Sequence, residues 1–167
     1  MKVVRSDPRG GVKMDSKEFK KFCKDEFTKR GFRKVKNEFY RQGNGVLCSL
    51  HLQHSDFGSI YYINICFYIG TFADKDYPTR YDYDFCGRFS AMTKKATQMG
   101  GGHFLSSGIE YNFYTEDELR PYIEKGFEEM IYPVLEHGKK KIIPLLEQKE
   151  FIPNILRDEE TLNKLKD

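Results

Sequence analysis

The chain has no tryptophan, no cysteine pair at C-x-x-C spacing and no apolar run close to membrane-spanning length. A transmembrane helix needs about 20 mostly apolar residues, so no association with a membrane is expected. The opening stretch, MKVVRSDPRGG, lacks the apolar segment of a secretory signal. These absences together predict a cytoplasmic protein.

The four cysteines are widely spaced, at Cys23, Cys48, Cys66 and Cys86. Zinc sites usually draw on closely spaced ligand pairs, so no metal centre is expected from these cysteines and the histidines. A disulfide framework is typical of small secreted domains, and this chain is larger and has no export signal. We therefore expect reduced, mostly buried thiols.

Sequence motifs for cofactors are also missing. The glycine-rich stretch at residues 98–107, QMGGGHFLSS, matches neither G-x-G-x-x-G nor the phosphate-binding P-loop. We interpret it as a flexible surface loop, with a phosphate-accepting nest as the alternative. The aspartates between residues 80 and 89 lack the spacing of a calcium loop. No cofactor and no metal is expected.

What the chain has in abundance is Phe, Tyr and charge. It carries 14 Phe and 11 Tyr, 32% of its 167 residues are charged, and its net charge is +3. This composition is typical of a folded domain. We expect residues 1–14 to be a flexible leader or a non-native remnant, residues 15–150 to form a single α+β domain, and residues 151–167 to form a C-terminal helical tail.

The stretch at residues 46–70, VLCSLHLQHSDFGSIYYINICFYIG, predicts two long antiparallel strands joined by a polar turn. The apolar positions have even numbers in the first strand and odd numbers in the second. Burial of both apolar sets on one face therefore requires paired positions to sum to an odd number. Pairing of Leu50 with Ile65 satisfies this rule, and it sets His51 opposite Asn64.

The opposite side of the hairpin is what we call the polar face, and its residues are Ser49, His51, Gln53, Tyr62, Asn64 and Tyr68. We hypothesise that this face, if uncovered, contacts a partner or ligand. The alternative is that it meets only water or lies beneath a C-terminal helix.

Further elements follow from periodicity. Residues 16–30 predict an amphipathic helix, residues 32–41 two short strands, residues 80–89 a fifth strand, and residues 109–113 a last short strand. A long helix after Thr115 should kink or break at Pro133. The expected fold is α+β, an antiparallel sheet of about five or six strands with an N-terminal helix and C-terminal helices packed on it.

Four short motifs occur here in an order that resembles a known bacterial family. They are Lys29-Arg30-Gly31-Phe32, Phe39-Tyr40-Arg41, Leu50-His51-Leu52-Gln53 and Tyr62-Ile63-Asn64-Ile65. As a set they resemble the family catalogued as domain of unknown function 4304, over roughly residues 17–135. The resemblance implies an α+β fold and assigns no activity or catalytic residue. Gln53 and Asn64 coincide with recurring polar strand positions of that family.

We expect a non-enzymatic protein-binding domain, because Tyr, His, Asn and Gln on one sheet face are typical of protein contacts. Analogy with other small α+β domains points to an immunity-type protein with a toxin-like partner. One alternative is a small-molecule-binding protein or hydrolase-like enzyme with a site around His51 and Cys66. Another is weak nucleic-acid binding through the basic N-terminal helix and hairpin at residues 17–41.

Overall fold

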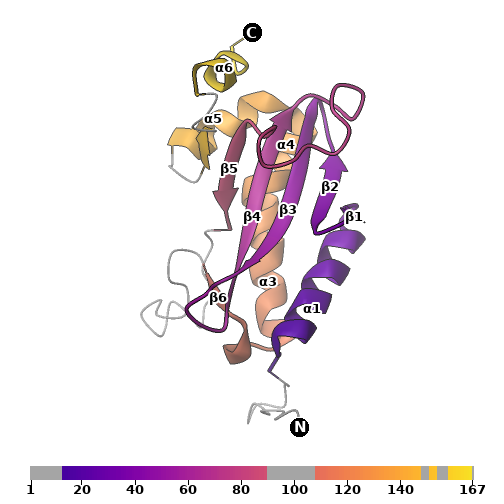
Figure 1. The fold of residues 1–167 in the computed structure, drawn as a ribbon, viewed down its shortest axis with the longest axis vertical. Helices are drawn as coiled ribbons and strands as arrows, with labels where there is room; N and C mark the ends of the chain where they lie inside the picture. The colour runs from indigo at the N-terminus through magenta and orange to yellow at the C-terminus, as the bar shows by residue number, and fades with distance from the viewer. Residues whose placement is uncertain (1–12, 90–107, 148–150, 154–157, 167) are drawn as a thin grey trace.

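The computed structural model describes residues 13–89, 108–147, 151–153 and 158–166 (Figure 1). The predicted leader up to residue 12 and the glycine-rich stretch at 98–107 lie outside these residues. The helices are α1 (Ser16–Lys29), α3 (Glu116–Gly126), α4 (Tyr132–His137), α5 (Ile142–Glu147) and α6 (Asp158–Asn163). The strands are β1 (Arg33–Val35), β2 (Glu38–Gln42), β3 (Val46–His54), β4 (Ile60–Ile69), β5 (Phe85–Arg88), β6 (Ile109–Glu110) and β7 (Phe151–Pro153).

The N-terminal helix α1 begins at the predicted residue and ends at Lys29, one residue before the predicted end. The carboxylate of Asp15 accepts a hydrogen bond from the backbone N–H of Glu18 at 2.8 Å, and Glu18 accepts in return from the N–H of Asp15. This reciprocal capping satisfies two N–H groups that the first turn leaves free. Gly31 follows the helix at φ +87°, a backbone conformation that favours glycine.

The central hairpin has the predicted register. β3 pairs with β4 so that Leu50 lies opposite Ile65 and His51 lies opposite Asn64. Leu50, Ile63 and Ile65 are fully buried. On the other face Ser49 is buried too, but the remaining polar side chains are half-buried or exposed. The register follows from this difference, since a slip by one residue would exchange the two faces.

All the main helices pack on the apolar face of the sheet. Figure 1 shows α3 and α4 behind strands β3 and β4. Phe27 of α1 lies between the sheet and the C-terminal helices, with its ring centroid 5.2 Å from Phe39 of β2 and 6.0 Å from Phe127. Among the residues that the structure describes, no helical layer covers the opposite face over β3 and β4, and the fold class is α+β as expected.

The sheet differs from expectation at its edges. Within the described residues it has seven strands, in the order β1-β2-β3-β4-β5-β7, with β6 paired to the far end of β4. The strand predicted over residues 80–89 is confined to Phe85–Arg88, and the last predicted strand continues only to Glu110 before a turn of 3₁₀-helix. The additional strand β7 pairs with β5.

The C-terminal helical region breaks where proline predicts a break. Thr115 caps α3 through a hydrogen bond from Glu118 N–H to its hydroxyl, at 3.2 Å. A wider π-helical turn, η3 (Phe127–Ile131), then separates α3 from α4. Pro133 has no N–H to donate to the carbonyl of Glu129, and the widened turn accommodates that loss.

Met14 belongs to the folded structure. Its side chain is 4% exposed and lies in the hydrophobic core, and its N–H donates to the carbonyl of Tyr114. The folded part of the chain therefore includes Met14, which was expected to belong to the leader.

Candidate functional site

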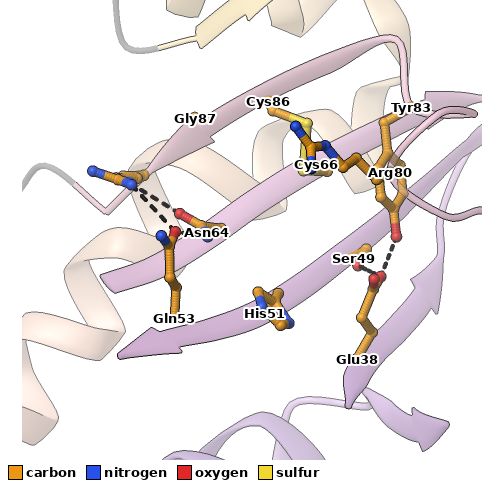
Figure 2. A pocket seen from close by; sticks show the side chains of 11 residues that line it. Glu38, Ser49, His51, Gln53, Asn64, Cys66, Arg80, Tyr83, Cys86 and Gly87 are labelled. Carbon is orange, nitrogen blue, oxygen red and sulfur yellow. Dashed lines mark hydrogen bonds between the residues drawn. A yellow bond between two sulfur atoms is a disulfide. The ribbon is translucent and has the colours of Figure 1, made fainter. Parts of the chain in front are cut away.

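The polar face carries a concavity of about 880 Å³, which we call the polar pocket. Ser49, His51 and Gln53 of β3 and Asn64 of β4 line it. The sequence predicted these four residues on one face, and the register brings them together. Figure 2 shows them along the floor of the pocket, with Ser49 near one end, His51 in the middle, and Gln53 and Asn64 at the other end.

A hydrogen-bonded group of side chains forms the end of the pocket at Gln53. Asn64 donates to the side-chain oxygen of Gln53 at 2.9 Å. Arg88 of β5 donates from Nε to Asn64 at 3.0 Å and from Nη2 to Gln53 at 3.3 Å. The guanidinium carbon of Arg88 lies 4.0 Å from the ring centroid of Tyr62, so Tyr62 supports the arginine from beneath.

The opposite end is organised by Glu38 of β2. Its carboxylate accepts hydrogen bonds from the hydroxyl of Ser49, at 2.7 Å, and from the hydroxyl of Tyr83. Burial, followed by the bond to Glu38, raises the pKa of Tyr83 far above its ordinary value, which keeps this hydroxyl protonated. The pair of donors holds the carboxylate in place.

The segment between β4 and β5 folds back over the Glu38 end of the face. The hydroxyl of Tyr40 donates to the carbonyl of Pro78 at 2.9 Å, and the N–H of Phe72 donates to the side chain of Gln42 at 3.0 Å. Burial also raises the pKa of Tyr40 to about 12. These contacts fix a wall of the pocket that includes Tyr83 and the exposed Arg80.

Between the two ends lies a disulfide between Cys66 and Cys86. The two cysteines are directly opposite each other on β4 and β5, with Cα atoms 4.2 Å apart. The expectation of reduced thiols is therefore wrong for this pair, because the pairing of β5 with β4 brings their side chains to the same face. Cys23 and Cys48 are free and buried, as expected.

Two predicted site residues lie outside the lining of the pocket. Tyr62 contacts it indirectly, through Arg88. The ring of Tyr68 lies near α6 instead, with Nζ of Lys164 at 5.3 Å from its centroid. Lys164 also forms an ion pair with the buried Asp84 at 2.9 Å, which attaches α6 beside this end of the face.

Sequence reasoning missed the contributions of Glu38, Arg80, Tyr83, Cys86 and Arg88. A signal was present for two of them, because Cys86 and Arg88 alternate with apolar Phe85 and Phe89. Tyr83 gave a misleading signal. Tyr83 lies two residues before Phe85, so a strand over residues 80–89 would place both side chains on the same face. The strand begins only at Phe85, however, and Tyr83 reaches the polar face from the preceding loop.

The basic residues at 17–41 are used in part within the fold. Arg30 binds the buried Glu26 at 2.7 Å, and Arg41 donates to the carbonyl of Arg30 at 2.9 Å. Lys21 pairs with Asp25 at 3.0 Å on the surface of α1. Because of these contacts, fewer Lys and Arg side chains of residues 17–41 are available to bind nucleic acid than the sequence indicates.

Among the described residues, no group of three or more His, Cys, Asp or Glu side chains is placed to hold a metal ion. With the residues that the structure describes, His51 makes one hydrogen bond, from Nδ1 to the carbonyl of Asn37 at 3.3 Å. Since a carbonyl can only accept, this contact assigns a proton to Nδ1. No described helix is long and apolar enough to cross a membrane.

Fold and site together define a small α+β domain with a helix-covered face and an open, pocketed polar face. The chain belongs to the family described as Domain of unknown function (DUF4304), whose model matches residues 23–137. The matched segment contains all the strands that line the pocket. Comparison with curated proteins and with solved structures gives no match.

Proposed function

We propose that this chain is a non-enzymatic protein-binding domain and that the polar face is its contact surface. The observation that carries the proposal is the open polar pocket, whose side chains are already held by one another. Gln53, Asn64 and Arg88 form one such group. Side chains that are fixed before binding lose little conformational freedom when a partner arrives.

The residue types of the face support the same proposal. Tyrosine and arginine are enriched among the residues that dominate protein–protein affinity, and here Tyr62 and Arg88 stack on each other. While the disulfide is closed, Cys66 has no thiolate to act as a nucleophile, so the hydrolase alternative requires the reduced protein.

The particular role that we propose is that of an immunity-type protein, which covers the active site of a toxin with this face. We extend the proposal to a cytoplasmic location, where cellular thiol systems keep most cysteines reduced. The Cys66–Cys86 pair would then be exposed to reduction in the cell.

The test is the double variant His51→Ala/Tyr62→Ala, compared with the wild type for retention of a protein from a lysate of the native host. The double variant removes His51 from the pocket lining and the ring that supports Arg88, and it should weaken retention at least tenfold, because residues central to binding contribute about 2 kcal/mol or more each. The melting temperature should change by only a few degrees, since both side chains are partly exposed.

The matched control is Phe57→Ala, which removes an aromatic side chain that is 97% exposed at the tip of the central hairpin. It should leave retention unchanged. Equal retention by the double variant and the wild type would show that the polar face is not the contact surface. If the wild type retains no protein, the proposal itself is wrong.

The size of the pocket favours a second candidate function, the binding of a small molecule. A volume of about 880 Å³ falls within the range of about 300–1,000 Å³ that ligand sites occupy. Most of the lining surface is apolar, as it is in ligand sites, but a carboxylate, amides, an imidazole and guanidinium groups also face the pocket. These polar groups favour a partner that supplies its own hydrogen-bonding groups.

A further inference from the structure

The guanidinium of Arg88 is held along one edge and over one flat surface. Nε and Nη2, which point along the same edge, donate to the oxygens of Asn64 and Gln53. The ring of Tyr62 lies against the plane of the group. Because Asn64 also donates to Gln53, the two amides orient each other as well as the arginine.

This arrangement leaves the outer end of the guanidinium open. An arginine has five N–H donors, and the edge formed by Nε and Nη2 uses two of them. The Nη1 and Nη2 hydrogens at the outer end have no partner among the described residues. Two such donors side by side match the two oxygens of a carboxylate.

The rest of the pocket adds positive charge. Arg80 lines the wall and makes no ion pair with a described carboxylate, and Figure 2 shows its side chain reaching over the cysteine pair. The one carboxylate in the lining, Glu38, lies at the opposite end and already accepts from two hydroxyls. The lining therefore offers no carboxylate at the Arg88 end to balance the charge of Arg88.

The geometry points to a carboxylate-binding subsite at Arg88 that takes an aspartate or glutamate side chain of the protein partner. This inference rests on the proposed function, because it names the chemistry by which the partner is recognised. Phosphate groups are more often bound by free backbone N–H groups at helix starts and nests. Here Gln53, Asn64 and Arg88 lie on strands of the paired sheet and offer side-chain donors.

The test uses N-acetyl-glutamate amide as the probe, with N-acetyl-glutamine amide as its neutral match, in an NMR titration of the whole chain. The acidic probe should produce saturable shifts in the side-chain signals of Gln53, Asn64 and Arg88, at millimolar concentration. The neutral probe should bind at least tenfold more weakly. Equal binding of both probes, or no saturable shift at these signals, would overturn the inference.

Arg88→Gln should abolish the binding of the acidic probe, and Arg33→Gln is its control. Arg33 is exposed on β1, so the control removes the same charge away from the pocket. Arg88→Lys provides a second variant that keeps the charge and loses the paired donors. It should lose at least tenfold in affinity, and wild-type affinity in either Arg88 variant would contradict the subsite.

Inorganic phosphate forms a further arm of the titration. Binding of phosphate at least tenfold tighter than the acidic probe would overturn the carboxylate assignment. The two proposals fail in different ways. Probe binding without any retained protein contradicts only the protein-binding function, whereas a protein retained equally by wild type and Arg88→Gln contradicts only the subsite.

Discussion

Glu26 is a buried carboxylate in α1 whose pKa is shifted far from its ordinary value. Its side chain is 5% exposed and accepts from Lys29 at 2.8 Å, Arg30 at 2.7 Å and Arg120 at 2.7 Å. Burial alone would raise its pKa, but the three hydrogen bonds outweigh burial and lower the pKa to about 2. The cluster joins α1 to α3 through Arg120.

This cluster predicts a loss of stability in acid. Because the folded pKa of Glu26 lies below its unfolded value of 4.5, its contribution is complete above about pH 5 and is lost as the pH falls toward 2. We expect Glu26→Gln to lower the free energy of unfolding by about 2–3 kcal/mol at pH 7. Urea unfolding at pH 7 and pH 3 measures both values.

The control for this prediction is Asp25→Asn, which breaks the surface pair with Lys21. Asp25 is 62% exposed, so its loss should change stability by less than about 1 kcal/mol. If the two variants are equally stable, or if the deficit of Glu26→Gln does not shrink at low pH, Glu26 does not hold α1 and α3 together in this way.

At the same scale, the predicted polar face supplies four of the eleven residues that line the pocket. Ser49, His51, Gln53 and Asn64 could be placed because their strands are long and their apolar sets have a fixed parity. Glu38 and Arg88 lie on shorter strands, of five and four residues. The partner and register of such strands depend on contacts distant in sequence, which alternation alone does not determine.

Among the elements, α3 lies unusually close to the residue that follows β5. Gly126, in the last turn of α3, packs against the ring of the fully buried Phe89. A Cβ atom at Gly126 would lie 1.7 Å from that ring. The helix therefore needs glycine here for packing, even though glycine is a poor helix former.

Gly126→Ala should consequently destabilise the protein, although the same change in an exposed helix would add about 1 kcal/mol. The overlap with Phe89 is expected to cost about 1–3 kcal/mol net. Thermal and urea unfolding measure the difference. The control Gly58→Ala, at a position with no atom within 4 Å of the added Cβ, should stay within about 0.5 kcal/mol of wild type.

The cause can be tested by adding Phe89→Leu to Gly126→Ala. The smaller side chain should restore part of the lost stability if overlap with the ring is the cause. A double variant that shows the simple sum of both losses would instead point to an effect of the alanine on the helix itself.

For the whole molecule, the oxidation state of Cys66 and Cys86 is the structural property that the sequence predicted least well. The β4–β5 pairing closes a disulfide across a sequence separation of 20 residues. A loop of that length predicts a stabilisation of about 3 kcal/mol from the restricted unfolded chain. The sequence alone could not reveal the bond, because it required the register of a four-residue strand.

Reduction should therefore be selective. In folded protein treated with a reductant, an alkylating reagent should modify Cys66 and Cys86, and mass spectrometry counts the added groups. Cys23 and Cys48 should react only in denaturant, since both are buried and burial raises the pKa of each thiol. Rapid labelling of all four cysteines in the folded protein would contradict this arrangement.

The same labelling tests the proposed location. Protein alkylated at the moment of cell lysis should carry reduced Cys66 and Cys86 if it resides in the cytoplasm. A bond that is already closed at that moment would indicate an oxidising compartment. Cys66→Ser/Cys86→Ser should lower the free energy of unfolding by about 3 kcal/mol relative to the oxidised wild type.

The pairing of β7 with β5 also sets an order of events during synthesis. β5, which carries Arg88 and Cys86, has β4 on one side and β7 on the other. Residues 151–153 leave the ribosome more than 60 residues after β5 does. Until then the outer backbone groups of β5 have no strand partner, so a nascent chain exposes a β-edge that can pair wrongly. β5, and with it one side of the polar face, thus gains its outer strand only once residues 151–153 are made, and a chain released before residue 151 would be prone to aggregation.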